Sequence, residues 1–352
     1  MSSAIEETTL PGDLPGVKLT SPKGTAEVYR HGAHVTSWKT ETGEELIFLS
    51  TDVRARSNAP PPASANLRAP RDPSTPLRAR PAHTRTHPPL LSPPRAAFPP
   101  PFRAHQVVFK PPKAIRGGIP ICFPQFSDLG PLDAQHGFAR NERWDIVAQT
   151  SDSVTMRLAS TPASLAKWPH AFEATYAVAL EADGGLATTL EVKNLGAEPM
   201  RFTTALHTYF RVGSVAGAKV TGLRGVKYLD QLDGSKSGLT DKDGLVGWER
   251  KTEEAEAVTF EREVDRVYLG APSRGVAIVD AARGAEVTLA TENLPDAVVW
   301  NPWIDKSKAT GDLGDEDYKA FVCVEAAAVE RPAEVKPGET WRCKQVLARN
   351  AV

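Results

Sequence analysis

Apolar and polar side chains alternate along much of this 352-residue chain, in short segments separated by turn residues. In residues 172–180, for example, an apolar side chain stands at every second position. A period of two places one face of a β-strand in a core and the other face toward solvent. Segments of this character recur at the spacing of an all-β domain, in residues 25–40, 144–161, 172–195, 200–212, 218–223, 267–270, 275–291, 297–303, 320–327 and 339–348.

The connections between these segments are mostly short. Residues 183–185 and 193–199 contain glycine and favour turns, while only residues 160–170 and 316–322 favour short helices. Neighbouring parallel strands would need crossover connections of about a dozen residues or more. The pattern therefore predicts an all-β fold, one large β-sandwich, in a single domain that spans residues 1–352.

One segment breaks the pattern. In residues 53–106 proline and arginine dominate, lysine is absent, and Asp72 is the only acidic residue. Such a composition cannot bury apolar surface, so we expect a disordered insertion within the domain. It is either an extended basic arm for a proline-reading module or an anionic partner, or a translated intron. His83 and His87 lie four apart in no predicted helix, so we expect no metal site there.

Composition excludes several classes of protein. With 41% hydrophobic residues and a formal net charge of −1, the chain has no electrostatic bias toward nucleic acid or membranes. It has no apolar run of about 18 residues, and its N-terminal segment resembles neither a secretory signal nor a transit peptide. We therefore expect a cytoplasmic protein. Cys122, Cys323 and Cys343 are too scattered for a disulfide framework or a metal site, and we expect them to be reduced and mostly buried.

Two ionisable residues interrupt apolar strand segments. His207 lies among strand-forming residues in 203–213, and Glu325 directly follows the apolar residues 321–324. A carboxylate is costly in such a position unless it is paired, and burial raises its pKa toward the range of a useful base. Each residue alone fits a structural role. Together on two predicted core strands they favour a general acid and base.

Two further segments carry candidate binding residues. Arg116 precedes two glycines, so its guanidinium and open backbone amides could bind an anion, or the segment is a turn that leads into a strand. His136 and Arg140 lie four apart in a turn-like segment. An imidazole beside a guanidinium suits hydroxyl groups and anions, although a solvated loop fits the spacing equally well.

Aromatic residues supply candidate walls for a pocket. Trp300 and Trp303 flank an Asn-Pro step that breaks a strand and could turn both indoles toward a cavity. Aromatic faces suit the C–H faces of a sugar ring, although two core tryptophans would give the same pattern. We expect the acidic loop after Lys308 to be a solvated lid.

Taken in order, these segments resemble the glucose-6-phosphate 1-epimerases, a branch of the aldose 1-epimerase (mutarotase) superfamily. The resemblance covers the chain from about Leu19 to Leu347 except for the insertion, which interrupts a short loop ahead of Arg116. The motifs that carry it are RGGIPICFPQF, QHGFARNERW, LHTYFRV, YLDQL, VVWNPWIDKSKA and FVCVEAA.

The resemblance implies a galactose-mutarotase-like β-supersandwich that interconverts the α and β anomers of a hexose 6-phosphate. No metal or cofactor is expected, nor any nucleic-acid or membrane partner, and the chain is expected to act as a monomer. By resemblance His207 is the general acid at the ring oxygen and Glu325 the general base at the anomeric hydroxyl. The other residues that match binding positions are Arg116 and Arg140 for phosphate, and His136 and Asp230 for the sugar.

Two alternatives remain open at this point. A carbohydrate-binding protein could keep the sandwich and its aromatic walls without catalysis. An epimerase for unphosphorylated aldoses would use the same acid and base and would not need the two arginines to meet.

Overall fold

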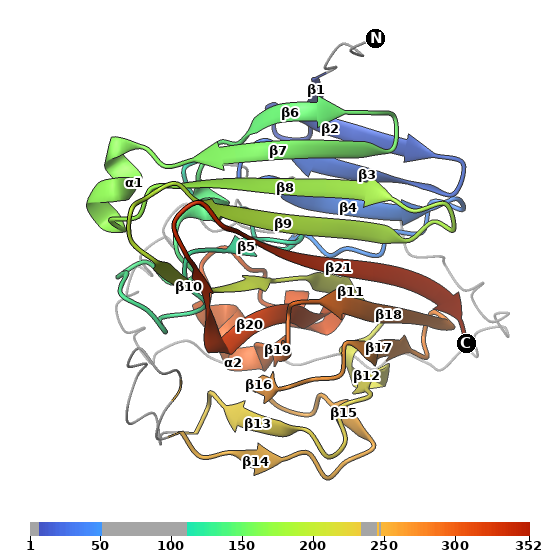
Figure 1. Ribbon diagram of the computed structural model, residues 1–352. Coiled ribbons are helices and arrows are strands. Elements are labelled where there is room, and N and C mark those ends of the chain that lie inside the picture. The colour runs from blue at the N-terminus through green and yellow to red at the C-terminus, as the bar shows by residue number, and fades with distance from the viewer. Residues whose placement is uncertain (1–6, 51–110, 234–244, 246–247) are drawn as a thin grey trace, which may run out of the picture.

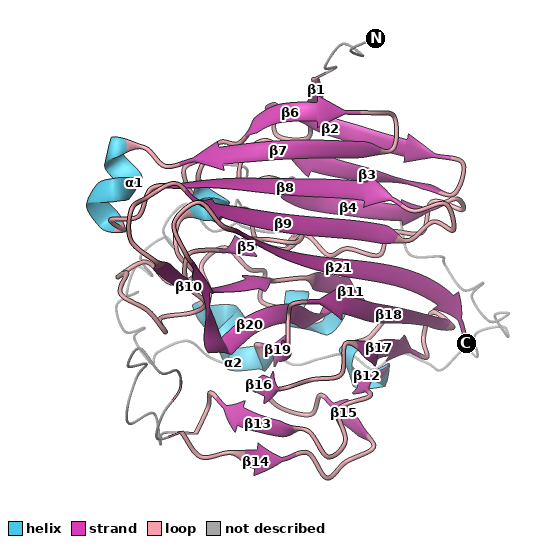
Figure 2. Ribbon diagram, in the orientation of Figure 1, coloured by secondary structure: helices cyan, strands magenta, loops and turns pink. Residues whose placement is uncertain are grey.

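The computed structural model describes residues 7–50, 111–233, 245 and 248–352. The insertion predicted at 53–106, which includes His83 and His87, lies outside the described residues. The described chain consists largely of antiparallel strands with few helices (Figures 1 and 2), which confirms the predicted fold class. The helices are α1 (Pro162–Lys167) and α2 (Trp303–Ala309), and the 3₁₀ turns are η1 (Ala139–Asn141), η2 (Val215–Gly217) and η3 (Asp317–Ala320).

The strands of the described ranges form three sheets. The four-stranded sheet has the order β1 (Thr8–Leu10), β2 (Leu14–Ser21), β3 (Gly24–Tyr29) and β4 (His34–Thr40). The eight-stranded sheet has the order β14 (Lys251–Thr252), β13 (Lys227–Asp230), β16 (Val264–Leu269), β19 (Asp296–Asn301), β20 (Phe321–Val335), β10 (Met200–Leu206) and β5 (Ile121–Cys122), and β11 (Tyr209–Arg211) pairs with β20. The nine-stranded sheet has the order β15 (Ala257–Thr259), β12 (Ala218–Thr221), β17 (Arg274–Asp280), β18 (Ala285–Glu292), β21 (Thr340–Ala351), β9 (Leu186–Asn194), β8 (Phe172–Leu180), β7 (Ser153–Ala159) and β6 (Asp145–Gln149).

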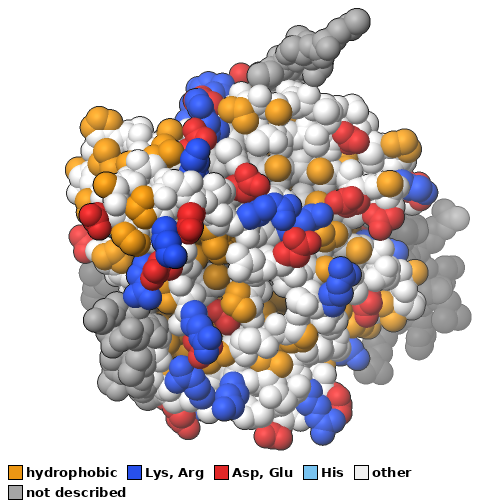
Figure 3. All heavy atoms as spheres, viewed as in Figure 1, with side chains coloured by type: hydrophobic (Ala, Val, Ile, Leu, Met, Phe, Trp, Pro, Cys, Tyr) orange, Lys and Arg blue, Asp and Glu red, His pale blue; other side chains and the backbone are white. Residues whose placement is uncertain are grey.

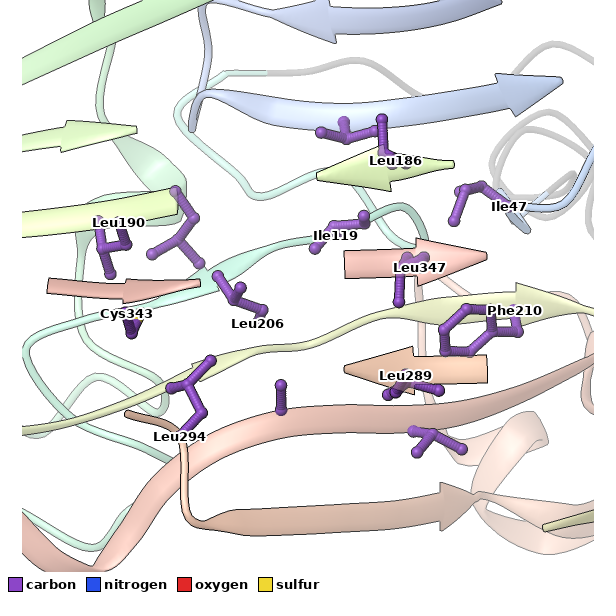
Figure 4. Close-up of a cluster of buried hydrophobic side chains, with 14 of the residues drawn as sticks. Ile47, Ile119, Leu186, Leu190, Leu206, Phe210, Leu289, Leu294, Cys343 and Leu347 are labelled. Carbon is purple, nitrogen blue, oxygen red and sulfur yellow. The ribbon is translucent and has the colours of Figure 1, made fainter. Parts of the chain in front are cut away.

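The nine-stranded sheet forms one layer, and the other two sheets form the second. In Figure 1 the β6–β9 half of the nine-stranded sheet lies in front of the four-stranded sheet, and the β21–β17 half of the nine-stranded sheet lies in front of the eight-stranded sheet. One large apolar core joins the layers. Figure 4 shows part of it, where Leu206 and Phe210 from one layer meet Leu190 and Leu347 from the other.

The alternation predicted from the sequence is confirmed in β8 and β9. Every second side chain of β8 is buried from Phe172 to Leu180. The predicted helix at 160–170 is present as α1. A capping box begins it: the side chain of Thr161 accepts from the amide of Ser164, and the side chain of Ser164 accepts from the amide of Thr161. At 316–322 the structure has only the 3₁₀ turn η3, and α2 was not predicted from the sequence.

The surface carries both signs of charge. On the face shown in Figure 3, Lys and Arg side chains lie among Asp and Glu side chains, and hydrophobic side chains gather near α1 at the left. No helix within the described ranges combines the length and apolar character that a membrane crossing requires. The three cysteines are free and buried, as predicted.

Strand β20 separates the core from the opposite face of its sheet. Val322, Val324 and Ala326 point into the core between the layers. Cys323 belongs to a smaller apolar cluster on the other face of the strand. Because side chains alternate along a strand, Glu325 lies on the same face as Cys323, outside the central core.

Asn301 ends β19 and holds the chain that leads into α2. It is fully buried, its Nδ2 donates to the carbonyls of Tyr318 and Phe321 (both 2.9 Å), and its Oδ1 accepts from the amide of Trp303 (3.0 Å). We expect Asn301→Ala to lower the free energy of unfolding by about 2–4 kcal/mol, because it leaves buried backbone groups without partners.

Urea denaturation measures this loss. The matched control is Asn350→Ala, an exposed strand position, which should change the free energy of unfolding by less than about 0.5 kcal/mol. Equal effects of the two substitutions would contradict the role of Asn301.

Candidate active site

An interruption between β10 and β11 positions His207. Leu206 pairs with Ala326 and Tyr209 pairs with Cys323, so His207 and its neighbour lie across from the Glu325 region of β20. The amide of His207 donates to the carbonyl of Pro120 (2.9 Å), which anchors the backbone at the break. The histidine in a strand segment is therefore the residue at which one strand ends and the next begins.

His207 and Glu325 form a buried pair. Nδ1 of His207 lies 3.5 Å from Oε1 of Glu325, and the two residues are 6% and 1% exposed. Oε2 of Glu325 has no hydrogen-bond partner within the described residues. A buried acceptor is costly when unsatisfied, so Oε2 has an unused capacity to accept a hydrogen bond.

Burial favours the neutral form of both groups. Desolvation, and then the positive charges of Arg140 and Arg116, lower the pKa of His207 well below its ordinary value. Desolvation, and then the charge of Asp265, raise the pKa of Glu325 well above its ordinary value. Proton transfer by the pair would need its ionic form, with His207 protonated and Glu325 ionised, in which the two opposite charges lie next to each other.

Asp265 belongs to this site, although the sequence analysis missed it. In the sheet Asp265 of β16 pairs with Trp300, and Trp300 pairs with Cys323, which places Asp265 on the same face as Glu325. Its carboxylate accepts from Nε2 of Gln231. The strand predicted at 267–270 is too short to include Asp265, whereas β16 begins at Val264.

Aromatic rings flank the acid. The ring of Tyr209 stacks on His207 with centroids 4.8 Å apart and planes 7° apart, and Trp300 meets His207 edge-on at 5.9 Å. Trp303 instead packs against Tyr318 at 5.2 Å. Of the two indoles expected to wall the pocket, the structure brings only Trp300 to His207.

His136 lies beside His207, with ring centroids 5.3 Å apart. Its Nδ1 accepts from the amide of Ser127 (3.0 Å), so the neutral ring carries its proton on Nε2 and donates from that side. Burial, and then the charge of Arg140, lower the pKa of His136 well below its ordinary value and favour this neutral form.

A tight turn presents Arg116. Gly117 and Gly118 have φ values of 102° and 70°, and a Cβ on Gly117 would lie 2.4 Å from the carbonyl oxygen of Phe48. The amide of Gly118 donates to that same carbonyl (2.8 Å). The prediction of open amides is thus wrong for Gly118.

Arg116 and Arg140 share a pocket of about 260 Å³. Nη2 of Arg140 donates to the carbonyl of Gln135 (2.9 Å), and its buried Nε has no partner among the described residues. Three basic side chains and one carboxylate give the pocket a positive balance that suits a dianion. Its charged and polar lining is Lys113, Arg116, Arg140, Asn141, Tyr209 and Asp312.

Asp230 lies at the end of β13, and its contacts tie it to the following turn. Its carboxylate accepts from the amide of Leu232 (3.1 Å) and lies 3.9 Å from Nζ of Lys251. Asp230 pairs with Arg266, next to Asp265 along β16, so the two aspartates face opposite sides of the sheet. The structure therefore brings His207, Glu325 and His136 together, beside the pocket of the two arginines, and does not bring Asp230 to them.

The described residues contain no group of three His, Cys, Asp or Glu side chains arranged to hold a metal ion. The described site brings together the buried pair of His207 and Glu325, the aromatic rings beside it and a pocket lined by two arginines.

Known proteins share this chain's sequence and fold. The aldose 1-epimerase family profile matches residues 95–348. A protein of Cenchrus ciliaris named "Putative glucose-6-phosphate 1-epimerase" is 38% identical over 334 residues, which cover 92% of this chain and 80% of that protein. A Salmonella typhimurium protein of the same name is 36% identical over 344 residues, 92% of this chain and 88% of its own.

The solved structures agree. A crystal structure titled "putative mutarotase (YeaD)", from Salmonella typhimurium, superposes with a TM-score of 0.72 and 25% identity, covering 98% of this chain and 93% of that one. The Slr1438 protein of Synechocystis has the same fold, with a TM-score of 0.67, 18% identity and coverage of 99% and 100%.

The chain belongs to the aldose 1-epimerase family. The resemblance and the mutarotase-like fold are confirmed, and the protein is an epimerase that interconverts sugar anomers.

Proposed function

We propose that this epimerase interconverts the α and β anomers of glucose 6-phosphate, with His207 as general acid and Glu325 as general base. The observation that carries the proposal is the buried pair, 3.5 Å apart, beside a pocket that Arg116 and Arg140 share. The names of the relatives from Cenchrus ciliaris and Salmonella typhimurium support the same substrate.

The geometry suits ring opening. The ring oxygen and the anomeric hydroxyl are bonded to the same carbon, C1, so an acid for one and a base for the other must lie side by side. Glu325 takes the hydroxyl proton on Oε2, its unpartnered oxygen. As the C1–O5 bond breaks, His207 protonates the ring oxygen, and the open-chain aldehyde forms.

Ring closure reverses the two roles. Rotation about the C1–C2 bond presents the other face of the aldehyde to the ring hydroxyl. His207 then removes the proton from that hydroxyl, and Glu325 returns a proton to the new anomeric oxygen. His136 donates from Nε2 to a sugar hydroxyl, Asp265 accepts from one, and Trp300 covers a C–H face.

The phosphate group binds between Arg116 and Arg140, where two planar guanidinium groups supply charge-assisted hydrogen bonds. Their positive charges lower the pKa of His207, after burial itself. A bound dianion offsets these charges, so phosphate binding raises the pKa of His207 toward the protonated form that the acid needs.

Residues 53–106 are proposed to be an insertion within a single domain. Ser50 supports this assignment, because its amide donates to the carbonyl of Arg116 (3.2 Å), so the described segments on either side of the insertion lie next to each other. We also propose a cytoplasmic monomer that works without metal or cofactor. Every group that the mechanism uses comes from one chain.

Magnetisation-transfer NMR tests the function, with glucose 6-phosphate and glucose compared at equal concentration. Faster exchange for the phosphate ester alone is the expected result. Equal acceleration of glucose would support an epimerase for unphosphorylated aldoses. Binding of either sugar without acceleration would support a carbohydrate-binding protein.

Arg140→Met is expected to raise KM for glucose 6-phosphate about 10–100-fold, because a charge-assisted phosphate contact contributes about 1.5–3 kcal/mol. KM is read from exchange rates at increasing substrate concentration. The control is Arg157→Met. Arg157 lies on β7 with its side chain 45% exposed, so its replacement should leave KM unchanged. An unchanged KM in Arg140→Met would contradict a role of Arg140 in phosphate binding.

A further inference from the structure

Asp312 holds one edge of the Arg116 guanidinium. Nε of Arg116 donates to Oδ1 of Asp312 (3.0 Å), and Nη2 donates to Oδ2 (3.2 Å). Nη1 donates to the hydroxyl of Tyr209 (3.1 Å). A guanidinium has five N–H donors, so one on Nη1 and one on Nη2 remain for a ligand in the pocket.

The loop that carries Asp312 is itself fixed. Leu313 is buried against Tyr209 and Phe321. The hydroxyl of Ser307 donates to the carbonyl of Gly314 (2.9 Å), and the amide of Gly314 donates to Asp317 (2.9 Å). The prediction of a merely solvated lid after Lys308 is therefore wrong for this part, since the loop sets the position of a carboxylate.

The same contacts reach the general acid. Tyr209 accepts from Arg116 through its hydroxyl, while its ring stacks on the imidazole of His207 at 4.8 Å. Tyr209 is 1% exposed, so its ring has little room to move. Asp312, Arg116, Tyr209 and His207 thus form one continuous series of contacts from the anion pocket to the acid.

We propose that Asp312 is a positioning residue and an internal counter-anion: it orients Arg116 for the phosphate and, through Tyr209, holds His207 for proton transfer. The proposal rests on the proposed function. Asp312 touches neither the reacting atoms nor His207, and it acts through Arg116.

The two parts of the role have opposite effects on binding and turnover. The carboxylate of Asp312 repels a phosphate in the same pocket, so its presence weakens binding of a free anion. It also fixes the donors that orient a sugar phosphate, and small misplacements of bound groups slow catalysis strongly. A residue that merely stabilised the loop would weaken binding and turnover together when replaced.

Asp312→Asn separates these possibilities, because asparagine keeps the shape and removes the charge. Calorimetry with inorganic phosphate should show binding about twofold to fivefold tighter, the range of a partly exposed ion pair. Magnetisation transfer with glucose 6-phosphate should show kcat about tenfold lower. Asp312→Glu should restore part of the lost kcat, and Tyr209→Phe should lower kcat without tightening phosphate binding.

The matched control is Glu316→Gln, which removes an exposed carboxylate that pairs with Lys319 near the same loop. It should change neither quantity. Phosphate binding that is unchanged or weaker in Asp312→Asn overturns the proposal, and so does an unchanged kcat.

A failure of the proposed function can be told apart from a failure of this proposal. In that case the wild-type protein would not accelerate exchange between the anomers of glucose 6-phosphate. The calorimetric comparison does not need turnover, so in that case it still decides whether Asp312 is a counter-anion.

Discussion

Replacing Glu325 with glutamine is expected to lower kcat for anomer exchange by roughly 10²–10⁴-fold, the usual contribution of a general base. Glutamine nearly matches the shape of glutamate and cannot accept the proton of the anomeric hydroxyl. KM should change little, because the proposed phosphate contacts of Arg116 and Arg140 remain. Magnetisation-transfer rates at several substrate concentrations measure both constants.

The same substitution is expected to stabilise the protein at neutral pH. The folded-state pKa of Glu325 is raised by burial, so its contribution to stability is fully present below about pH 4.5 and is lost as pH rises toward the folded value. Glutamine has no such dependence. Glu325→Gln should therefore raise Tm at pH 7–8 relative to wild type, with the difference shrinking toward pH 4.5.

Glu334→Gln on the same strand is the control for both measurements. Glu334 is about half exposed and pairs with Arg201 at the surface, so its loss should change kcat by less than about twofold and the free energy of unfolding by less than about 0.5 kcal/mol. Wild-type turnover in Glu325→Gln would remove Glu325 from catalysis.

His207→Gln is expected to lower kcat by roughly 10²–10⁴-fold, because it removes the proposed proton donor to the ring oxygen. Nδ1 of His207 faces Glu325. This leaves Nε2 for the ring oxygen, and the glutamine amide reaches a similar position without an acidic proton. Retention of more than about a tenth of the wild-type kcat would contradict this role.

The pH dependence of stability gives a second measurement on His207. Its folded-state pKa is lowered, so the unfolded chain takes up a proton below about pH 6.5 before the folded protein does. Wild type therefore loses stability from His207 as pH falls below that value. His207→Gln should lose less Tm than wild type between pH 7 and pH 5. His170→Gln serves for comparison: burial also lowers the pKa of this partly exposed histidine, so its substitution should act in the same direction with a smaller change in Tm.

Much of the sheet structure could be predicted from local pattern. The alternation in residues 172–195 specifies a hairpin with one buried face, and β8 and β9 form it. Glu325 could be found in the same way, since a carboxylate after four apolar residues demands a partner. His207 is recognisable as a polar residue inside a strand segment. These signals lie within a few residues of the position that they concern.

Other parts of the site carry no local signal. Asp265 is an ordinary acidic residue in the sequence, and only the pairing of β16 with β19 and β19 with β20 places it on the face of Glu325. The parity of the strand decides this, because neighbouring side chains face opposite sides of the sheet. By the same alternation, Asp230 faces the side of the sheet opposite to Asp265 and Glu325.

The sequence by itself determined the all-β class and marked His207 and Glu325 as a candidate acid–base pair, because strand periodicity and the cost of burying charge act locally. Only the tertiary structure decided which charged groups meet. Arg116 and Asp312 are 196 positions apart, and a bidentate contact between them depends on how two loops close over the same sheet. Electrostatic contacts act through space within a few ångströms, whatever the separation along the chain.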